Sequence, residues 1–285
     1  MLTSQEKPVW KIEAKSSYLN LNLAELLSYR HLLFRLVRKE FLINYQQTLL
    51  GPIWILFQPL LTMVTYVFVF NKIIGVSIGS KIPAVLFYFS GIVLWNFFND
   101  SFGATSKTFR DNISVFSKVY FPRLIVPLAS IITQSFRFLI QFIFLIIILL
   151  IFIFARGFDF HFSPYAVAVP FIVIIVGLLS LSLGLIMSVL TAKYRDLGNF
   201  VDIFVRILLF ITPVIYPLSS VKENIRWVVQ LNPLAPLFEL FRLGVLGEGT
   251  VSPWGLAYSI AFTLVSLLMA ILLFNKMGSK LIDVI

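Results

Sequence analysis

The sequence of 285 residues contains no cysteine and only two histidines, His31 and His161. Without cysteine the chain can form neither a disulfide nor a thiolate metal site, although this leaves its compartment undecided. The predicted topology puts these two histidines on opposite sides of a membrane, so neither a histidine metal cluster nor a histidine-based dyad is expected. Nucleophile-elbow, zincin and Walker A motifs are also missing, so we expect no bound cofactor and no ATP hydrolysis by this chain alone.

Charged residues are scarce as well, at 13% of the chain, whereas 59% of the residues are hydrophobic and the mean hydropathy is +0.94. These values lie outside the range of soluble domains and predict an integral membrane protein. A span of about 20 apolar residues crosses the bilayer as a helix, because lipid offers no partners to backbone polar groups. Runs of this length also argue against a membrane β-barrel. The expected fold is all-α, with spans near 52–75, 84–106, 124–155, 163–191, 199–218 and 254–274.

The basic residues predict the orientation of these spans. Of the 23 Lys and Arg residues, fifteen fall on the side of the N-terminus and six on the opposite side. Positive charge favours the cytoplasm, so we expect a cytoplasmic-membrane protein with both termini inside. The net charge of +10 is then mainly a signal of topology, and attraction to anionic lipid headgroups is secondary. Nucleic-acid binding is a poor alternative.

Residues 1–50 precede the first span and are polar or amphipathic, so we expect no cleavable signal peptide. A mobile polar arm is expected first, followed by an amphipathic helix near residues 25–45. Arg35 and Arg38 lie on its polar face, whereas Glu40 interrupts its apolar face. The pattern predicts a helix along the cytoplasmic interface, and a docked soluble helix remains an alternative.

Two further segments predict packing features. Residues 234–246 are apolar but too short to cross a bilayer, and they follow a proline-interrupted start, so 219–253 is expected to form a re-entrant or surface-lying helix pair on the outside. In the fourth span Ser180, Gly184 and Ser188 recur every four residues. Small residues at this spacing predict close helix packing.

Five phrases in order carry a family resemblance: RKEFLINYQQTLLGPIWILFQPLLTMVTYVFVF, SKVYFPRLIVPLAS, AKYRDLGNFV, TPVIYPLSSV and LNPLAPLFELFRLGVLG. From about residue 25 onward, the chain resembles the permease subunits of type-2 ABC exporters for polysaccharides, the O-antigen and capsule group. The resemblance implies a six-span permease domain over 51–285 and a homodimer that works with two separate ATP-binding-cassette ATPase subunits, which hold ATP and Mg²⁺. The implied substrate is a glycan such as O-antigen, often linked to polyprenyl pyrophosphate.

Other functions stay open at this stage. A capsular polysaccharide or teichoic acid exporter fits the same resemblance. A secondary transporter would need ion-coupling acids near mid-membrane, and no acid stands clearly at that depth. A membrane glycosyltransferase would need a D-x-D type motif on a cytoplasmic loop, which is missing.

The resemblance also implies an ATPase-coupling surface. In this family the loop between the second and third spans carries a coupling helix that docks into the ATPase, with the interface helix beside it. The external segment 219–248 would border the outer exit. The coupling residues carried over to this sequence are Lys107, Arg110, Asp111, Phe116 and Lys118 from the loop, with Arg35 and Arg38 from the interface helix.

Aromatic side chains in the second span form a candidate glycan path. Tyr88, Trp95, Phe98 and Phe102 fall on one helical face. Aromatic faces suit the apolar faces of sugar rings, so these residues are candidate substrate contacts. Lipid-facing or packed rings are the alternative, because the chain has 30 phenylalanines.

Two arginines lie inside predicted spans, Arg137 in the third and Arg206 in the fifth. Both are expected at inner-leaflet depth, and Asp202 precedes Arg206 at the favourable i, i+4 spacing. Arg137 could simply snorkel toward the headgroups while Arg206 pairs with Asp202. The functional hypothesis is that both guanidinium groups receive the pyrophosphate of a lipid-linked glycan.

Overall fold

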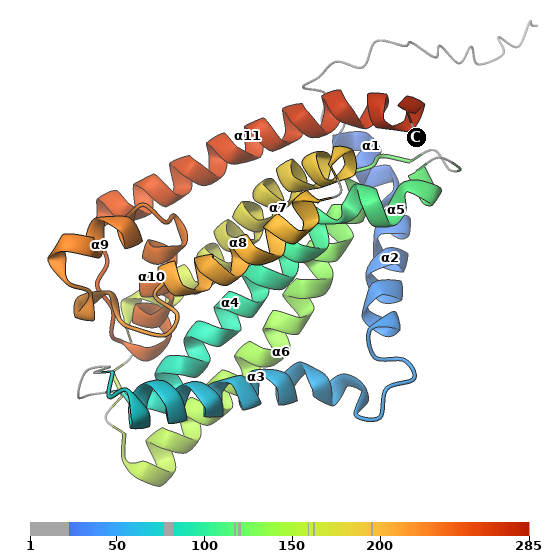
Figure 1. The fold of residues 1–285 in the computed structure, drawn as a ribbon. Helices are drawn as coiled ribbons and strands as arrows, with labels where there is room; N and C mark the ends of the chain where they lie inside the picture. The colour runs from blue at the N-terminus through green and yellow to red at the C-terminus, as the bar shows by residue number, and fades with distance from the viewer. Residues whose placement is uncertain are drawn as a thin grey trace, which may run out of the picture.

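The structure is a computed structural model that describes residues 23–76, 82–116, 118, 121–158, 160–161, 163–194 and 196–284. Most of the predicted polar arm, residues 1–22, lies outside these ranges. Within them the chain is all helical with no strand, which confirms the expected fold class (Figure 1). The elements are α1 (Leu23–Ser28), α2 (Arg30–Ile43), the 3-10 turn η1 (Gly51–Ile53), α3 (Trp54–Tyr66), the π-helical η2 (Val67–Ile73), α4 (Ala84–Ser106), α5 (Thr108–Phe116), α6 (Ile125–Arg156), the 3-10 helix η3 (Pro164–Ala168), α7 (Val169–Lys193), α8 (Leu197–Ile211), the 3-10 turn η4 (Leu218–Ser220), α9 (Glu223–Gln230), α10 (Leu234–Leu246) and α11 (Pro253–Val284).

Four helical stretches in the described residues are long and apolar enough to cross a membrane: Gly51–Ile73, Ile125–Arg156, Pro164–Lys193 and Pro253–Lys276. They match four of the expected spans. The other two expected spans are covered by α4 and α8, which differ from them in polarity and in length.

The expected second span, α4, has 23 residues but carries Asn96, Asn99 and Asp100 near its end. It lies between α6 and α7 and also contacts α3, so neighbouring helices shield much of its surface. The expected fifth span forms a helix of only 15 residues, because α8 ends at Ile211. Thr212, the residue before Pro213, is extended at φ −83° and ψ 138°, as the proline ring favours.

The predicted small-residue stripe packs α7 tightly against α4. A Cβ added at Gly184 would lie 2.6 Å from Cβ of Thr105 and 3.2 Å from the backbone oxygen of Phe102. One turn further on, the backbone N–H of Phe109 donates to Oγ of Ser188 at 3.0 Å. The predicted close packing is therefore confirmed, and the same stripe fixes the start of α5.

The amphipathic helix α2 packs along α6. Val37 is buried on this side, whereas Arg35 and Arg38 are exposed. Glu40, which interrupts the apolar face in the sequence, accepts a hydrogen bond from Oγ of Ser130 on α6 at 3.0 Å. Burial raises the pKa of the Glu40 carboxyl above its ordinary value. The acid thus belongs to the contact between the two helices.

The predicted pair of short helices is present as α9 and α10. Arg242 and Glu239 on α10 are almost fully buried and lie 3.7 Å apart. Arg242 donates to the backbone oxygen of Val214 at 2.7 Å, and its guanidinium carbon lies 3.9 Å from the ring centroid of Phe87 on α4. Oε1 of Glu239 accepts from the backbone N–H of Leu218 at 3.2 Å. This pair ties α10 to α4 and to the segment that follows α8.

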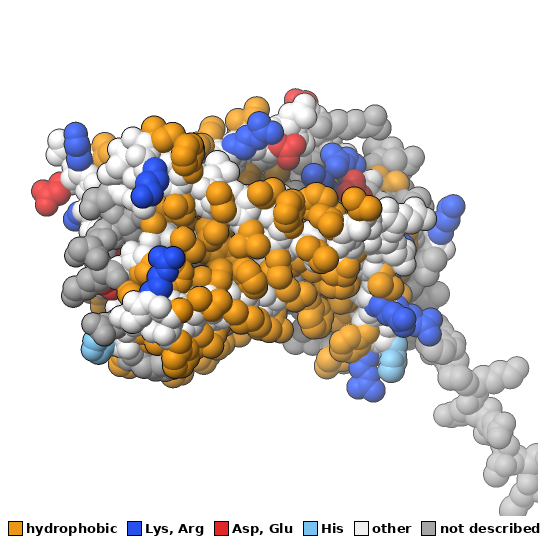
Figure 2. Space-filling view, turned by 90° about the horizontal axis from the view of Figure 1, so that it is seen from below, with side chains coloured by type: hydrophobic (Ala, Val, Ile, Leu, Met, Phe, Trp, Pro, Cys, Tyr) orange, Lys and Arg blue, Asp and Glu red, His pale blue; other side chains and the backbone are white. Residues whose placement is uncertain are grey.

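The two groups of short helices lie at opposite ends of the bundle. In Figure 1, α1, α2, α5 and the last turns of α11 share one end, and α9 and α10 lie at the other. Figure 2 shows hydrophobic side chains over the middle of one face, with most Lys and Arg side chains around them. This distribution is typical of a helix bundle whose long axis crosses the bilayer, with the apolar middle in lipid and the charged ends near the headgroups.

Candidate functional site

A polar pocket of about 340 Å³ lies where the end of α2, the start of α3, α4 and α6 meet. Helices α3, α4 and α6 each present polar residues at helical spacing, i to i+3 or i+4, so that they share a face. The lining residues are Asn44, Tyr45, Trp54, Ile55, Gln58, Pro59, Thr62, Asn96, Asn99, Asp100, Arg137 and Gln141. Most of them are polar, which is unusual within an apolar bundle.

Arg137, the isolated arginine of α6, lies in this pocket opposite Asp100 of α4. Nη1 of Arg137 is 3.8 Å from Oδ2 of Asp100 and donates to Oε1 of Gln134 at 3.2 Å. The guanidinium carbon also lies 5.2 Å from the ring centroid of Tyr45, a cation–π distance. Nε of Arg137 is buried and has no hydrogen-bond partner within the described residues. The arginine is therefore charge-balanced but not fully hydrogen-bonded.

Side-chain amides form the rest of the polar wall. Nδ2 of Asn99 donates to Oδ1 of Asp100 at 2.9 Å. Nε2 of Gln141 donates to the backbone oxygen of Ile55 at 3.1 Å, and Nδ2 of Asn96 lies 3.5 Å from Oε1 of Gln141. The last contact is long, so Asn96 keeps most of its hydrogen-bonding capacity for another partner.

Asp100 was not predicted as a site residue, because the sequence was considered only for ion-coupling acids near mid-membrane, and Asp100 lies toward the end of its predicted span. The available signal was the group Asn96, Asn99 and Asp100, spaced i, i+3 and i+4 in an otherwise apolar helix. A group of this kind needs polar partners on a neighbouring helix. Arg137 and Gln141, also one turn apart, supply those partners from α6.

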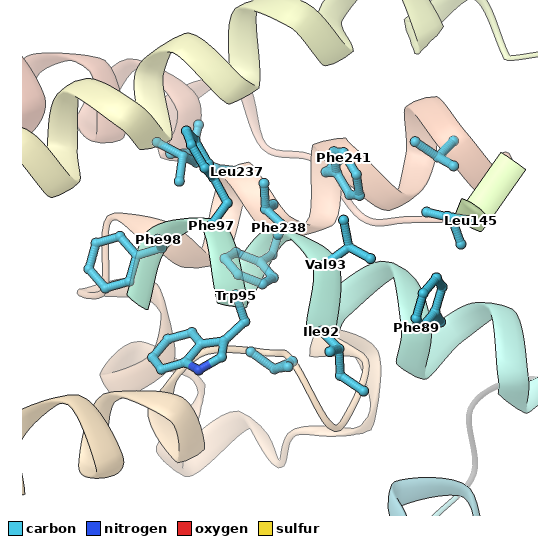
Figure 3. Close-up of a cluster of buried hydrophobic side chains, with 14 of the residues drawn as sticks. Phe89, Ile92, Val93, Trp95, Phe97, Phe98, Leu145, Leu237, Phe238 and Phe241 are labelled. Atoms are coloured by element: carbon cyan, nitrogen blue, oxygen red, sulfur yellow. The ribbon is translucent and has the colours of Figure 1, made fainter. Parts of the chain in front are cut away.

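The aromatic face of α4 lies inside the protomer. Tyr88, Trp95, Phe98 and Phe102 are between 0% and 7% exposed. The Phe98 and Phe102 rings stack with centroids 5.9 Å apart, and Trp95 lies 5.7 Å from Phe98. Figure 3 shows Trp95 and Phe98 in the hydrophobic cluster around α4 that also includes Phe238 of α10. This position favours the packing alternative for these rings over a glycan path within one protomer.

The structure does not bring Arg206 to Arg137 within one chain. Arg206 lies on the exposed side of α8 and does not line the pocket. Asp202 is also exposed, and among the described residues it forms no ion pair with Arg206. The pocket thus contains one of the two arginines predicted as substrate contacts.

The predicted coupling residues divide into an exposed set and a packed set. Arg110 and Asp111 of α5 are about half exposed, with Nε and Oδ1 3.0 Å apart. Lys118 is exposed too, as are Arg35 and Arg38 of α2, and α2 and α5 share one end of the bundle (Figure 1). Lys107 is half-buried, and the Phe116 ring is buried with its centroid 5.8 Å from that of Phe109. Phe116 thus packs α5 onto the bundle, and the charged residues form its outer surface.

The site supplies groups for binding but no reactive couple. Within the described ranges no group of three or more His, Asp or Glu residues could hold a metal ion. The pocket offers five side-chain amides, the hydroxyls of Thr62 and Tyr45, the rings of Tyr45 and Trp54, and one compensated ion pair. Such a set can hold an uncharged polar ligand through hydrogen bonds.

Comparisons with known proteins place the chain in a family. Residues 31–246 match the ABC-2 type transporter family. A relative from Klebsiella pneumoniae, the O-antigen export system permease protein RfbA, is 26% identical over 264 residues, which cover 89% of this chain and 95% of that protein. A protein of the same name from Myxococcus xanthus is 28% identical over 221 residues, which cover 76% of this chain and 81% of that protein. Because the family match covers well over half of the sequence, the chain belongs to the ABC-2 type transporter family.

Proposed function

We propose that this chain is the permease subunit of an ATP-driven exporter that moves an O-antigen type polysaccharide, linked to a polyprenyl pyrophosphate, from the cytoplasmic side across the inner membrane. The observation that carries the proposal is the match to the Klebsiella pneumoniae O-antigen export permease over 95% of that protein's length. The absence of a Walker A motif from the sequence assigns ATP hydrolysis to a separate subunit.

The proposed assembly contains two copies of this chain and two ATPase subunits, and α4 and α8 complete six spans in each copy. Asp202 and Arg206 support the dimer, because both are exposed on α8 and charged groups at membrane depth avoid lipid. This face of α8 is proposed to meet the second copy, where Arg206 would contact substrate. The basic end with α1, α2 and α5 is proposed to be cytoplasmic, following the excess of Lys and Arg on that side.

The direct test of export is deletion of the gene in its native cell. Surface polysaccharide is expected to fall at least tenfold while lipid-linked glycan accumulates at the inner membrane. Restoring the chain is expected to restore export, but only if the partner ATPase retains its own catalytic residues. Surface polysaccharide is measured by immunoblot, and lipid-linked glycan by extraction and mass spectrometry. Unchanged surface polysaccharide after deletion would refute the proposed function, and export that continues with an inactive ATPase would favour a secondary transporter.

Cross-linking tests the coupling surface and the topology together. Single cysteines at Arg110 and Lys118 are expected to cross-link to the ATPase subunit, because both side chains are exposed on or beside α5. A cysteine at Trp254, which is 85% exposed at the start of α11, serves as the control at the opposite end. The native chain contains no cysteine to interfere. Adducts that form from residue 254 and not from 110 or 118 would reverse the proposed orientation.

A further inference from the structure

We infer that the polar pocket around Asn96 and Arg137 binds a sugar unit of the exported glycan, and that it is not a site for the lipid pyrophosphate. The inference rests on the proposed function for the source of the glycan. It assigns a ligand chemistry to the pocket, and this chemistry follows from the charge, the hydrogen-bonding groups, the rings and the size of the site.

The charge balance of the pocket argues against an anionic ligand. Arg137 is the only cationic side chain among the lining residues, and Asp100 lies 3.8 Å from it. The two charges compensate each other, and the other lining side chains are uncharged. A pyrophosphate bound to Arg137 would also approach the Asp100 carboxylate, and like charges at such distances repel. Sites for phosphate groups instead gather several cationic or N–H donors that face the anion.

The hydrogen-bonding groups suit sugar hydroxyls. Asn44, Gln58, Asn96, Asn99 and Gln141 each carry a carbonyl acceptor and an amino donor, and a hydroxyl likewise both donates and accepts. Several of these groups have unused capacity. The Gln58 side chain forms no hydrogen bond within the described part of the chain, and the Asn96 contact is 3.5 Å long. Nε of Arg137 adds a buried donor that has no partner among the residues that the structure describes.

Aromatic rings and volume complete the match. Trp54, which is 42% exposed, and Tyr45 border the pocket beside these amides. A ring face combined with neighbouring amides fits a sugar, which has an apolar C–H face and a polar edge. The volume of about 340 Å³ lies at the lower end of small-molecule pockets, roughly 300–1,000 Å³, so the pocket suits one sugar unit rather than a long oligosaccharide.

A photo-cross-link identifies which part of the substrate occupies the pocket. The amino acid p-benzoylphenylalanine replaces Trp54 in the full chain, expressed with its ATPase in cells that make the glycan. After irradiation the chain is purified and treated with mild acid, which cleaves the pyrophosphate linkage. Carbohydrate on the protein is then detected by periodate oxidation. We expect the carbohydrate to remain after acid, because the cross-link joins the protein to the sugar itself.

The control position is Phe136 on α6, an aromatic residue 50% exposed that lies next to Arg137 in sequence but does not line the pocket. The same cross-linker there is expected to give at least fivefold less acid-stable carbohydrate. Asn96→Leu, combined with the cross-linker at Trp54, is expected to lower the adduct yield at least fivefold while the chain still co-purifies with its ATPase. The same cross-linker at Thr62, another lining residue, replaces the Trp54 experiment if the chain altered at Trp54 does not assemble with the ATPase.

Three results would overturn the sugar assignment. Carbohydrate released by mild acid would show that the lipid or its phosphates occupy the pocket. Equal yields of acid-stable carbohydrate from cross-linkers at Trp54 and Phe136 would show that the glycan touches the protein nonspecifically and does not bind in the pocket. No carbohydrate adduct from Trp54 or Thr62, in cells whose export depends on this chain, would exclude the pocket from the glycan path. Failure of the proposed function is distinguished separately, because export would then continue after deletion of the gene.

Discussion

Replacing Arg242 with alanine is expected to destabilise the folded chain by about 3–5 kcal/mol, which is typical when one partner of a buried ion pair is removed. The Glu239 carboxylate would stay buried in the middle of α10 without the Arg242 guanidinium, which lies 3.7 Å away. The hydrogen bond to the backbone oxygen of Val214 and the contact with the Phe87 ring would disappear as well. The thermal midpoint in detergent, followed by size-exclusion fluorescence, is expected to fall by on the order of 10 °C.

Two matched variants test the cause of this loss. Arg242→Met combined with Glu239→Gln removes both charges and keeps much of the side-chain volume, so it is expected to be clearly more stable than the single alanine variant. Arg156→Ala, at the exposed end of α6, removes an arginine without breaking a buried pair and is expected to be near neutral. A double variant no better than Arg242→Ala would assign the loss to packing around Phe87 and not to the unpaired acid.

The same substitution at two glycines is expected to have opposite effects. In Gly184→Ala the new Cβ would lie 2.6 Å from Cβ of Thr105, so α7 and α4 must move apart. The expected cost is about 1–3 kcal/mol, as for other overpacked positions. In Gly103→Ala the new Cβ meets no atom of the described residues within 4 Å, and alanine is the better helix former by about 0.5–1 kcal/mol.

Expression level and thermal midpoint of both glycine variants provide the measurement. Gly184→Ala is expected to lower the expression level and the thermal midpoint. Gly103→Ala is expected to leave the expression level unchanged and to raise the thermal midpoint. A pair of variants with equal midpoints would show that α4 and α7 are not held as closely as the structure has them. Partial restoration of Gly184→Ala by a second change, Thr105→Ser, would locate the clash at this residue, because serine lacks the methyl group 2.9 Å from the added Cβ but keeps the Cβ at 2.6 Å.

Patterns along a single helix were predictable from the sequence. The all-helical class, the close contact at Gly184 and the two short helices near 219–253 follow from composition, small-residue spacing and proline placement. Pro213 was visible too, but the expected span 199–218 ran across it, whereas α8 ends at Ile211. A run of apolar residues indicates what can lie in lipid, and the proline decides where the helix stops.

Contacts between helices were harder to predict from the sequence. The pairing of Asp100 with Arg137 joins helices separated by α5, and no local period reports it. The helical wheel also grouped Tyr88, Trp95, Phe98 and Phe102 correctly on one face of α4. It could not show whether that face meets a cavity, lipid or the rest of the bundle, because all three environments accept aromatic rings.

The ion pair between Asp100 and Arg137 has a consequence for the biosynthesis of the chain. α6 is the most apolar of the four long apolar stretches, and it can enter the bilayer with one arginine, Arg137, in its interior. α4 carries two amides and an acid, so it is a poor insertion segment on its own. Because α4 leaves the ribosome first, we expect it to stay near the translocon until α6 supplies the arginine. The two helices are then expected to enter lipid together, with Asp100 and Arg137 balancing each other and with two of the pocket's walls in place.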